Sequence, residues 1–249
     1  MESIYTLSPL NIVLLLFSGL LIGISKTGVP GLGMLAIILS AMALPARHST
    51  GLVLVMLICG DLFAVAYYRR QAVWKHLLRI IPWAFLGIII GYFSLGKIND
   101  RQLKPVIALT ILSILALNHW WKSRDTGKLN IPERWWFAAF LGLLAGTTTM
   151  MANAAGPIMI IYLLAMGLPK KEFIGTGAWY FFIMNWVKVP FSANLGLINA
   201  ESMRLNFIIL PAVAAGALAG IAVMKKLPEK AFNIIVQILT AAAALKLLF

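Results

Sequence analysis

Ten long blocks of apolar residues follow one another along the chain, and they constrain its fold more than any other feature. The blocks cover residues 9–25, 29–44, 48–68, 77–96, 103–121, 134–150, 154–168, 172–191, 204–224 and 229–248. Only 12% of the 249 residues are charged, which is about half of the charged fraction of a soluble domain. Apolar blocks of this length belong in lipid, so the sequence predicts an all-α polytopic membrane protein.

Two of these blocks are too short to cross a bilayer as regular helices, because a spanning helix needs about 20 residues. Blocks 29–44 and 154–168 are the short ones, and each follows its predecessor after a connector of only a few residues. The pairs 9–44 and 134–168 are therefore predicted to be short, broken or re-entrant helices.

The basic residues lie mainly in alternate loops. When the N-terminus is placed outside, 14 of the 21 Lys and Arg residues fall in loops predicted to be cytoplasmic, and 5 fall in outside loops. This bias is the usual orientation signal of membrane proteins. This bias accounts for the net charge of +13, so nucleic-acid binding is not needed to explain it. The chain also has no basic linear motif for binding RNA or DNA.

Glycine, proline and polar residues recur at matching positions in the two halves of the chain. The matched pairs are Gly19 with Gly142, Gly23 with Gly146, Pro45 with Pro169, Asp61 with Asn185, Pro82 with Pro211, Gly87 with Gly216 and Gly91 with Gly220. Each half holds five blocks, an odd number, so the second half enters the membrane from the opposite side. The sequence therefore predicts two inverted repeats, 1–121 and 134–249, joined by a cytoplasmic linker at 122–133. The glycine pairs themselves also suit close helix packing.

Two polar, glycine-rich stretches break the short helix pairs, at 23–33 and 146–157. Each brings hydroxyl groups to the start of a helix, where unpaired N–H groups and the helix dipole attract anions. We expect Pro30 and Pro157 in the opening turns of the following helices, and Asn153 as a cap. A tight helix connection alone would have a similar composition, but the matching positions favour an anion site. The candidate binding residues are Ser25, Lys26, Thr27, Gly28, Thr147, Thr148, Thr149, Asn153, Asn185 and Lys188.

Two charged residues lie well inside apolar blocks. Asp61 is the only carboxylate in such a position, and a carboxylate in lipid is costly and usually functional. It could exchange a proton during transport, or it could form a structural hydrogen bond or a salt bridge with Lys26 or Lys188. Lys188 could hold substrate charge or pair with Asp61, or its ammonium could extend to the interface. The aromatic run at 179–182 suits either packing or the lining of a pathway.

Enzyme chemistry is not expected. No Ser/His/Asp arrangement, His cluster or pair of carboxylates lies within the blocks, so we predict neither a catalytic residue nor a metal site or cofactor. Cys59 is the only cysteine, and one thiol cannot form an internal disulfide.

The second half carries several strings that resemble the TauE/SafE family of bacterial membrane permeases. They are Ala152-Asn-Ala-Ala-Gly-Pro-Ile-Met159, Tyr162-Leu-Leu-Ala-Met-Gly-Leu-Pro-Lys170, Gly175-Thr-Gly-Ala-Trp179 and Asn185-Trp-Val-Lys-Val-Pro-Phe191. The stretch 23–33 resembles the other glycine-rich segment of the family, although Val29, Pro30 and Leu32 interrupt its glycine run. The resemblance covers nearly the whole chain.

The resemblance implies transport, mostly export, of sulfur-containing anions across the bacterial inner membrane. We therefore expect a secondary transporter of sulfite, thiosulfate or an organosulfonate, working by alternating access, with Asp61 as a proton-coupling residue. The alternatives are a passive anion channel and a non-transporting membrane assembly protein. The expected partners are the small anion and membrane lipid, and a homodimer is left open.

Overall fold

The computed structural model describes residues 8–44, 46–94 and 135–228, together with residues 231, 232, 234, 235, 238 and 242. The predicted block 103–121, the linker 122–133 and most of the block 229–248 lie outside the described residues. Within the described part the chain forms helices and no strand. The all-α class is thus confirmed for this part of the protein.

The helices coincide with the predicted blocks. They are α1 (Pro9–Thr27), α2 (Leu32–Ala43), α3 (Ala46–Tyr68), α4 (Trp74–Ser94), α6 (Trp135–Ala152), α7 (Gly156–Ala165), α8 (Lys170–Asn194) and α9 (Ala200–Lys226). Among them α1, α3, α4, α6 and α9 are long and apolar enough to cross a membrane. α2 has 12 residues and α7 has 10, so both are too short to cross, as predicted. This pattern supports a multi-pass membrane protein.

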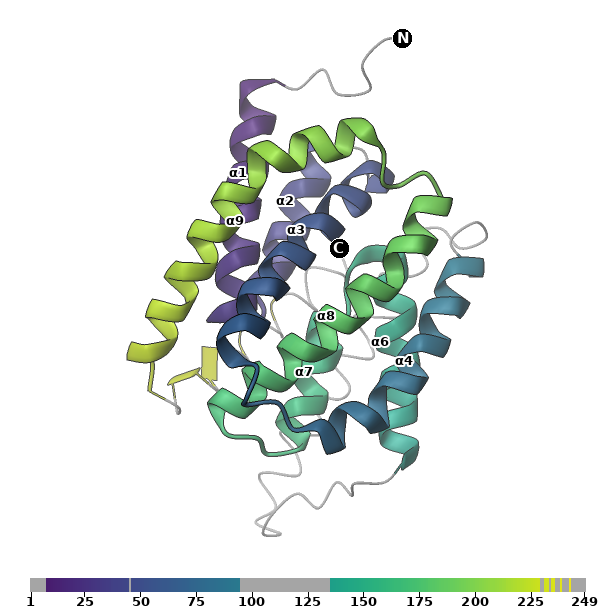
Figure 1. Cartoon of the computed structure of the whole chain (residues 1–249), viewed down its shortest axis with the longest axis vertical. Coiled ribbons are helices and arrows are strands. Elements are labelled where there is room, and N and C mark those ends of the chain that lie inside the picture. Colours follow the sequence, from purple (N-terminus) through teal and green to yellow (C-terminus); the bar gives the residue numbers. More distant parts are fainter. Residues whose placement is uncertain are drawn as a thin grey trace.

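The first helix of each half packs against the fourth helix of the other half. α1 lies along α9 and α6 lies along α4, while α3 and α8 pack against each other between these pairs. In Figure 1, α1 descends from the top of the molecule, whereas α6 rises from the bottom. The hairpins α1–α2 and α6–α7 therefore enter from opposite ends.

Glycines allow these helix pairs to come close together. A Cβ atom on Gly23 would overlap the carbonyl oxygen of Val213 in α9, and a Cβ atom on Gly146 would overlap that of Ala84 in α4. The packing role expected of the glycine pairs is confirmed at these positions.

The two helix breaks differ in backbone detail from the prediction. In the first break Gly31 precedes α2 with φ 105°, a conformation that favours glycine. Pro30 therefore lies in the turn before α2, and its predicted place in the opening turn is wrong. In the second break α7 begins at Gly156 after Ala155, without a side-chain cap, and Pro157 lies in its first turn as predicted. The predicted cap by Asn153 is wrong, because this side chain is bonded elsewhere.

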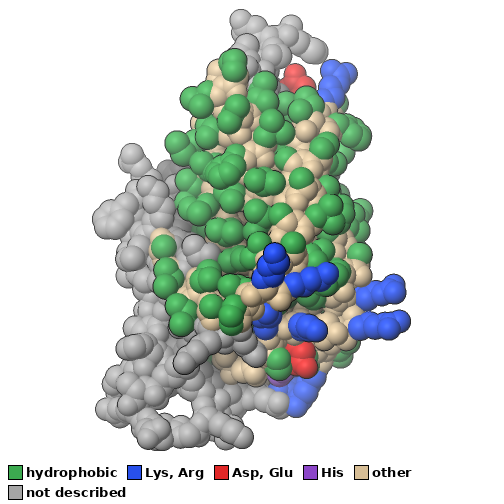
Figure 2. All heavy atoms as spheres, turned by 90° about the vertical axis from the view of Figure 1, so that its left-hand side faces the viewer, with side chains coloured by type: hydrophobic (Ala, Val, Ile, Leu, Met, Phe, Trp, Pro, Cys, Tyr) green, Lys and Arg blue, Asp and Glu red, His purple; other side chains and the backbone are tan. Residues whose placement is uncertain are grey.

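Many large apolar side chains are exposed on α1, α4 and α9, as expected for helices that face lipid. Figure 2 shows apolar side chains over most of the described face, with Lys and Arg side chains gathered toward its lower end. The ends of helices that point this way in Figure 1 carry Arg69, Arg70, Lys170, Lys225 and Lys226. The distribution agrees with the predicted orientation, in which this end faces the cytoplasm.

Candidate functional site

A pocket lies where the two helix breaks meet in the interior. The first break contributes Ser25, Lys26, Pro30, Gly31 and Gly33, and the second contributes Thr149, Asn153 and Gly156. Residues from α2, α3, α7 and α8 complete the wall. The pocket holds about 790 Å³ of space free of protein atoms, its open part included.

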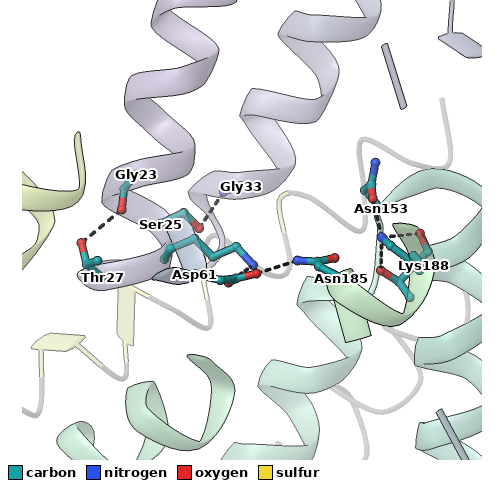
Figure 3. A network of polar contacts seen from close by, with 10 residues as sticks. Gly23, Ser25, Thr27, Gly33, Asp61, Asn153, Asn185 and Lys188 are labelled. Atoms are coloured by element: carbon teal, nitrogen blue, oxygen red, sulfur yellow. Dashed lines mark hydrogen bonds and ion pairs between the residues drawn. The ribbon is translucent and has the colours of Figure 1, made fainter. Parts of the chain in front are cut away.

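One side of the pocket is built on an ion pair between α1 and α3. Lys26 lies in the last turn of α1, and its Nζ is 2.7 Å from Oδ1 of Asp61, which is fully buried in α3. Asn185 of α8 donates from Nδ2 to Oδ2 of the same carboxylate at 2.7 Å, as Figure 3 shows. Both oxygens of Asp61 are therefore engaged, and the salt bridge to Lys26 considered from the sequence is present.

Lys26 has a second neighbour besides Asp61. Its Nζ lies 4.1 Å from the centroid of the Phe181 ring, over the ring face, where a cation is attracted by the π-electrons. Lys26 and Phe181 both line the pocket. The ammonium group is thus held at the wall by a carboxylate and an aromatic ring, and it is the cation that the pocket presents.

Lys188 lies just behind the pocket wall, with only 1% of its surface exposed. Its Nζ donates to the carbonyl oxygen of Thr149 at 3.1 Å, to Oγ1 of Thr149 at 3.0 Å and to Oδ1 of Asn153 at 2.6 Å. All three acceptors are neutral, and no ion pair joins Lys188 to a carboxylate in the described part of the chain. The lysine neither extends to the interface nor bonds to Asp61. It holds in place two side chains that line the pocket (Figure 3).

Asn153 links three helices at the end of α6. It has φ 53°, a left-handed conformation that Asn tolerates better than most residues. Its Nδ2 donates to the carbonyl oxygen of Thr50 in α3 at 3.0 Å, while its Oδ1 accepts from Lys188 in α8. These bonds explain why the side chain does not cap α7.

The polar residues of the first break divide into two groups. Ser25 lines the pocket, and its Oγ accepts from the Gly33 amide at 3.0 Å across the break. Thr27 is fully buried and donates from Oγ1 to carbonyl oxygens of Gly23 and of Ala217 in α9. Gly28 ends α1, and its amide already donates to the Ile24 carbonyl oxygen. Neither Thr27 nor Gly28 lines the pocket; both lie where α1 packs against α9.

The three consecutive threonines of α6 divide in the same way. Only Thr149 lines the pocket. Thr147 donates from Oγ1 to carbonyl oxygens of Leu143 and of Gly87 in α4, and Thr148 donates to the Ala145 carbonyl oxygen. The hydroxyl groups of Thr147 and Thr148 therefore satisfy backbone oxygens within and between helices.

Basic side chains outnumber acidic ones beside the pocket. Among the described residues, Lys26 and Lys188 lie beside it with a single carboxylate, that of Asp61. A buried charge without a partner is strongly unfavourable in a low-dielectric interior. The arrangement therefore favours the binding of a negatively charged solute.

A large part of the pocket wall is apolar, and apart from Phe181, which belongs to the aromatic run at 179–182, it was not predicted from the sequence. Met159, Ile160 and Leu163 of α7 line it together with Ile174 and Phe181 of α8. The sequence does contain a pattern for the α7 part of this wall, because residues 156, 159, 160 and 163 have the spacing of one helix face. In a uniformly apolar segment this face cannot be told from one that contacts lipid.

Comparison with known proteins identifies the family. The chain matches the family described as "Sulfite exporter TauE/SafE" over residues 15–247, which is nearly its whole length. No curated protein and no solved structure gives a significant match. The resemblance carried by the second-half strings is thereby confirmed. The chain belongs to the TauE/SafE family of membrane transporters.

Proposed function

We propose that the protein is a secondary transporter that exports a small sulfur-containing anion, such as sulfite, thiosulfate or an organosulfonate, across the bacterial inner membrane. The observation that carries the proposal is the pocket at the junction of the two helix breaks, where Lys26 lines the wall, paired with the buried carboxylate of Asp61. The family description supports export and the sulfur oxyanion class. An inside-negative potential would favour export, since moving one charge through 100 mV changes the free energy by about 2.3 kcal/mol.

The proposed architecture is a pair of inverted repeats around this pocket. Equivalent residues make equivalent contacts: a Cβ atom on Gly216 would overlap the Leu20 carbonyl oxygen, and a Cβ atom on Gly87 would overlap that of Leu143. Asp61 and Asn185, matched in the sequence, are hydrogen-bonded to each other. Residues related by a two-fold axis touch only near that axis. This contact supports an axis between α3 and α8, beside the pocket.

Proton coupling would act through the ion pair. Ionised Asp61 holds Lys26, so an anion must compete with the carboxylate for the ammonium group. Protonation of Asp61 removes this competition and leaves Lys26 to balance the charge of the anion, so the proton and the anion would cross in the same direction and export would draw its energy from the outward gradient of the anion. Alternating access would then open the pocket to each side of the membrane in turn, with the two hairpins moving against the central helices.

Anion flux from proteoliposomes tests the proposal. Purified protein is expected to move sulfite, thiosulfate or methanesulfonate in response to an anion gradient, and Lys26→Met should reduce the flux at least tenfold, because it removes the cation that the pocket presents. Lys171→Met is the matched control, since Lys171 is exposed at the start of α8. Absence of flux for all three anions would identify a non-transporting protein. Flux that never accumulates anion under a proton gradient would identify a channel.

A further inference from the structure

The two ends of the pocket differ in chemistry. Its polar side chains come from the ends of α1 and α6 and from the middle of α8; they are Ser25, Lys26, Thr149, Asn153 and Asn185. Away from this polar end the lining is formed by aliphatic, aromatic and glycine residues of α2, α7 and α8. The lining therefore divides into a polar part and an apolar part.

α7 carries the wall away from the polar end. Gly156 begins this helix beside Asn153, and the same face continues through Met159 and Ile160 to Leu163. These seven steps advance about 10 Å along the helix axis. No polar side chain interrupts this face of α7.

α8 runs back along the same wall. Phe173, Ile174 and Gly177 line the pocket over about 6 Å of helix axis, before Phe181, whose ring lies against Lys26, and Asn185 reach the polar end. A Cβ atom on Gly177 would lie 3.4 Å from Cδ1 of Leu163. The distal parts of the two apolar faces are therefore adjacent, and together they form an apolar arm that leads away from Lys26.

We propose that the pocket takes an organic anion with an apolar body, such as an alkyl- or arylsulfonate, in preference to an inorganic oxyanion. The inference rests on the proposed function and narrows its substrate class. The sulfonate group would lie at Lys26, Thr149 and Asn185, and the hydrocarbon would lie in the apolar arm between α7 and α8. A sulfonate has acceptor oxygens at one end only. Sulfite would leave the apolar arm unfilled or would lose hydration against it.

A series of sulfonates of increasing length tests the inference. Binding to the protein in lipid nanodiscs is measured for sulfite, methanesulfonate, butanesulfonate and hexanesulfonate. The dissociation constant should fall about fourfold for each methylene that enters the apolar arm. Hexyltrimethylammonium has a similar tail with the opposite charge, so it serves as the control for non-specific partition of the tail into lipid. It should show no saturable binding.

Two variants localise the effect to the apolar arm. Gly177→Val adds side-chain volume beside Leu163, and Ile174→Thr makes the wall more polar with a small change in size; each should flatten the dependence of affinity on tail length. Leu218→Ala, at an exposed position of α9, should leave the dependence as in the wild type. If sulfite binds as tightly as hexanesulfonate, this inference is overturned and the proposed function stands. If no member of the series binds and none is transported, both are overturned.

Discussion

At the scale of single residues, Lys188 organises the second break rather than facing the pocket. Three oxygens of Thr149 and Asn153 surround its ammonium group. Lys188→Met would take this donor from Oγ1 of Thr149 and Oδ1 of Asn153, whereas the Thr149 carbonyl oxygen still accepts from the Asn153 amide. Each buried group left unsatisfied costs about 1–3 kcal/mol. We expect a lower thermal unfolding temperature and weaker anion binding than in the wild type. Lys171→Met, at an exposed position of the same helix, should change neither. Wild-type stability of Lys188→Met would refute this role.

Asp61→Asn tests the ion pair as the site of proton coupling. The amide can still accept the hydrogen bond from Asn185, but it cannot hold Lys26 as a counterion. In the wild type, anion affinity should rise as the pH falls, because protonation of Asp61 releases Lys26. In the variant, affinity should be high at every pH and a proton gradient should no longer drive transport. The measurements are anion binding and proteoliposome flux across a pH series.

Glu201→Gln is the control for this prediction, since it removes a carboxylate from the first turn of α9, remote from the pocket lining. Its pH profile should follow the wild type. If Asp61→Asn retains the wild-type pH dependence, the coupling role assigned to Asp61 is wrong, although an anion site could still exist.

The residues that line the pocket could be predicted from the sequence only in part. Ser25, Lys26, Thr149, Asn153 and Asn185 do line it. Thr27 and Thr148 are adjacent to lining residues in the chain but face other helices or their own backbone. One residue step turns a helix by about 100°, so neighbouring hydroxyl groups point in different directions. The residue type predicts a polar segment, and the helix packing decides which of its side chains reach the pocket.

At the scale of helices, the close contacts α1–α9 and α4–α6 require glycine at equivalent positions. Gly23→Ala and Gly146→Ala should each destabilise the protein by roughly 1–3 kcal/mol or more, because backbone atoms cannot move aside as side chains do. The comparison with Gly156→Ala is informative, since its new methyl group would meet open space. Thermal unfolding in detergent measures all three. Equal stability of Gly23→Ala and Gly156→Ala would contradict the packing.

The positions of the helices could be predicted from the sequence, but the backbone geometry of the two breaks could not. The short block at 29–44 contains α2 (Leu32–Ala43), and that at 154–168 contains α7 (Gly156–Ala165). Hydropathy locates apolar segments but does not report backbone conformation. Val29 and Pro30 are apolar and lie outside any helix. The turn depends on the positive φ of Gly31, which the many glycines of this stretch do not single out.

At the scale of the whole molecule, the uneven distribution of charge predicts how the protein sits in the membrane. Arg69, Arg70 and Lys170 belong to helix ends on the same side of the molecule as the end of α9, which carries Lys225 and Lys226 (Figure 1). Figure 2 shows Lys and Arg side chains gathered toward the lower end of the described face, with apolar surface above. Cytoplasmic loops retain basic residues during insertion. This end should therefore face the cytoplasm, and the apolar arm of the pocket, which extends toward the start of α8, should point the same way.

Cysteine labelling in intact cells tests this orientation. Cys59→Ser removes the single native thiol, and cysteines are then placed one at a time at two exposed positions of α9, Arg204→Cys near its start and Lys226→Cys at its end. A membrane-impermeant maleimide should label Arg204→Cys in intact cells and Lys226→Cys only after permeabilisation. The reverse pattern would place the basic end outside, and the pocket's apolar arm would then lead away from the cytoplasm. An exporter takes up its substrate from the cytoplasm. If the labelling follows the expected pattern, the apolar arm leads toward the cytoplasm, and the tail of a bound sulfonate lies on the side from which the substrate enters.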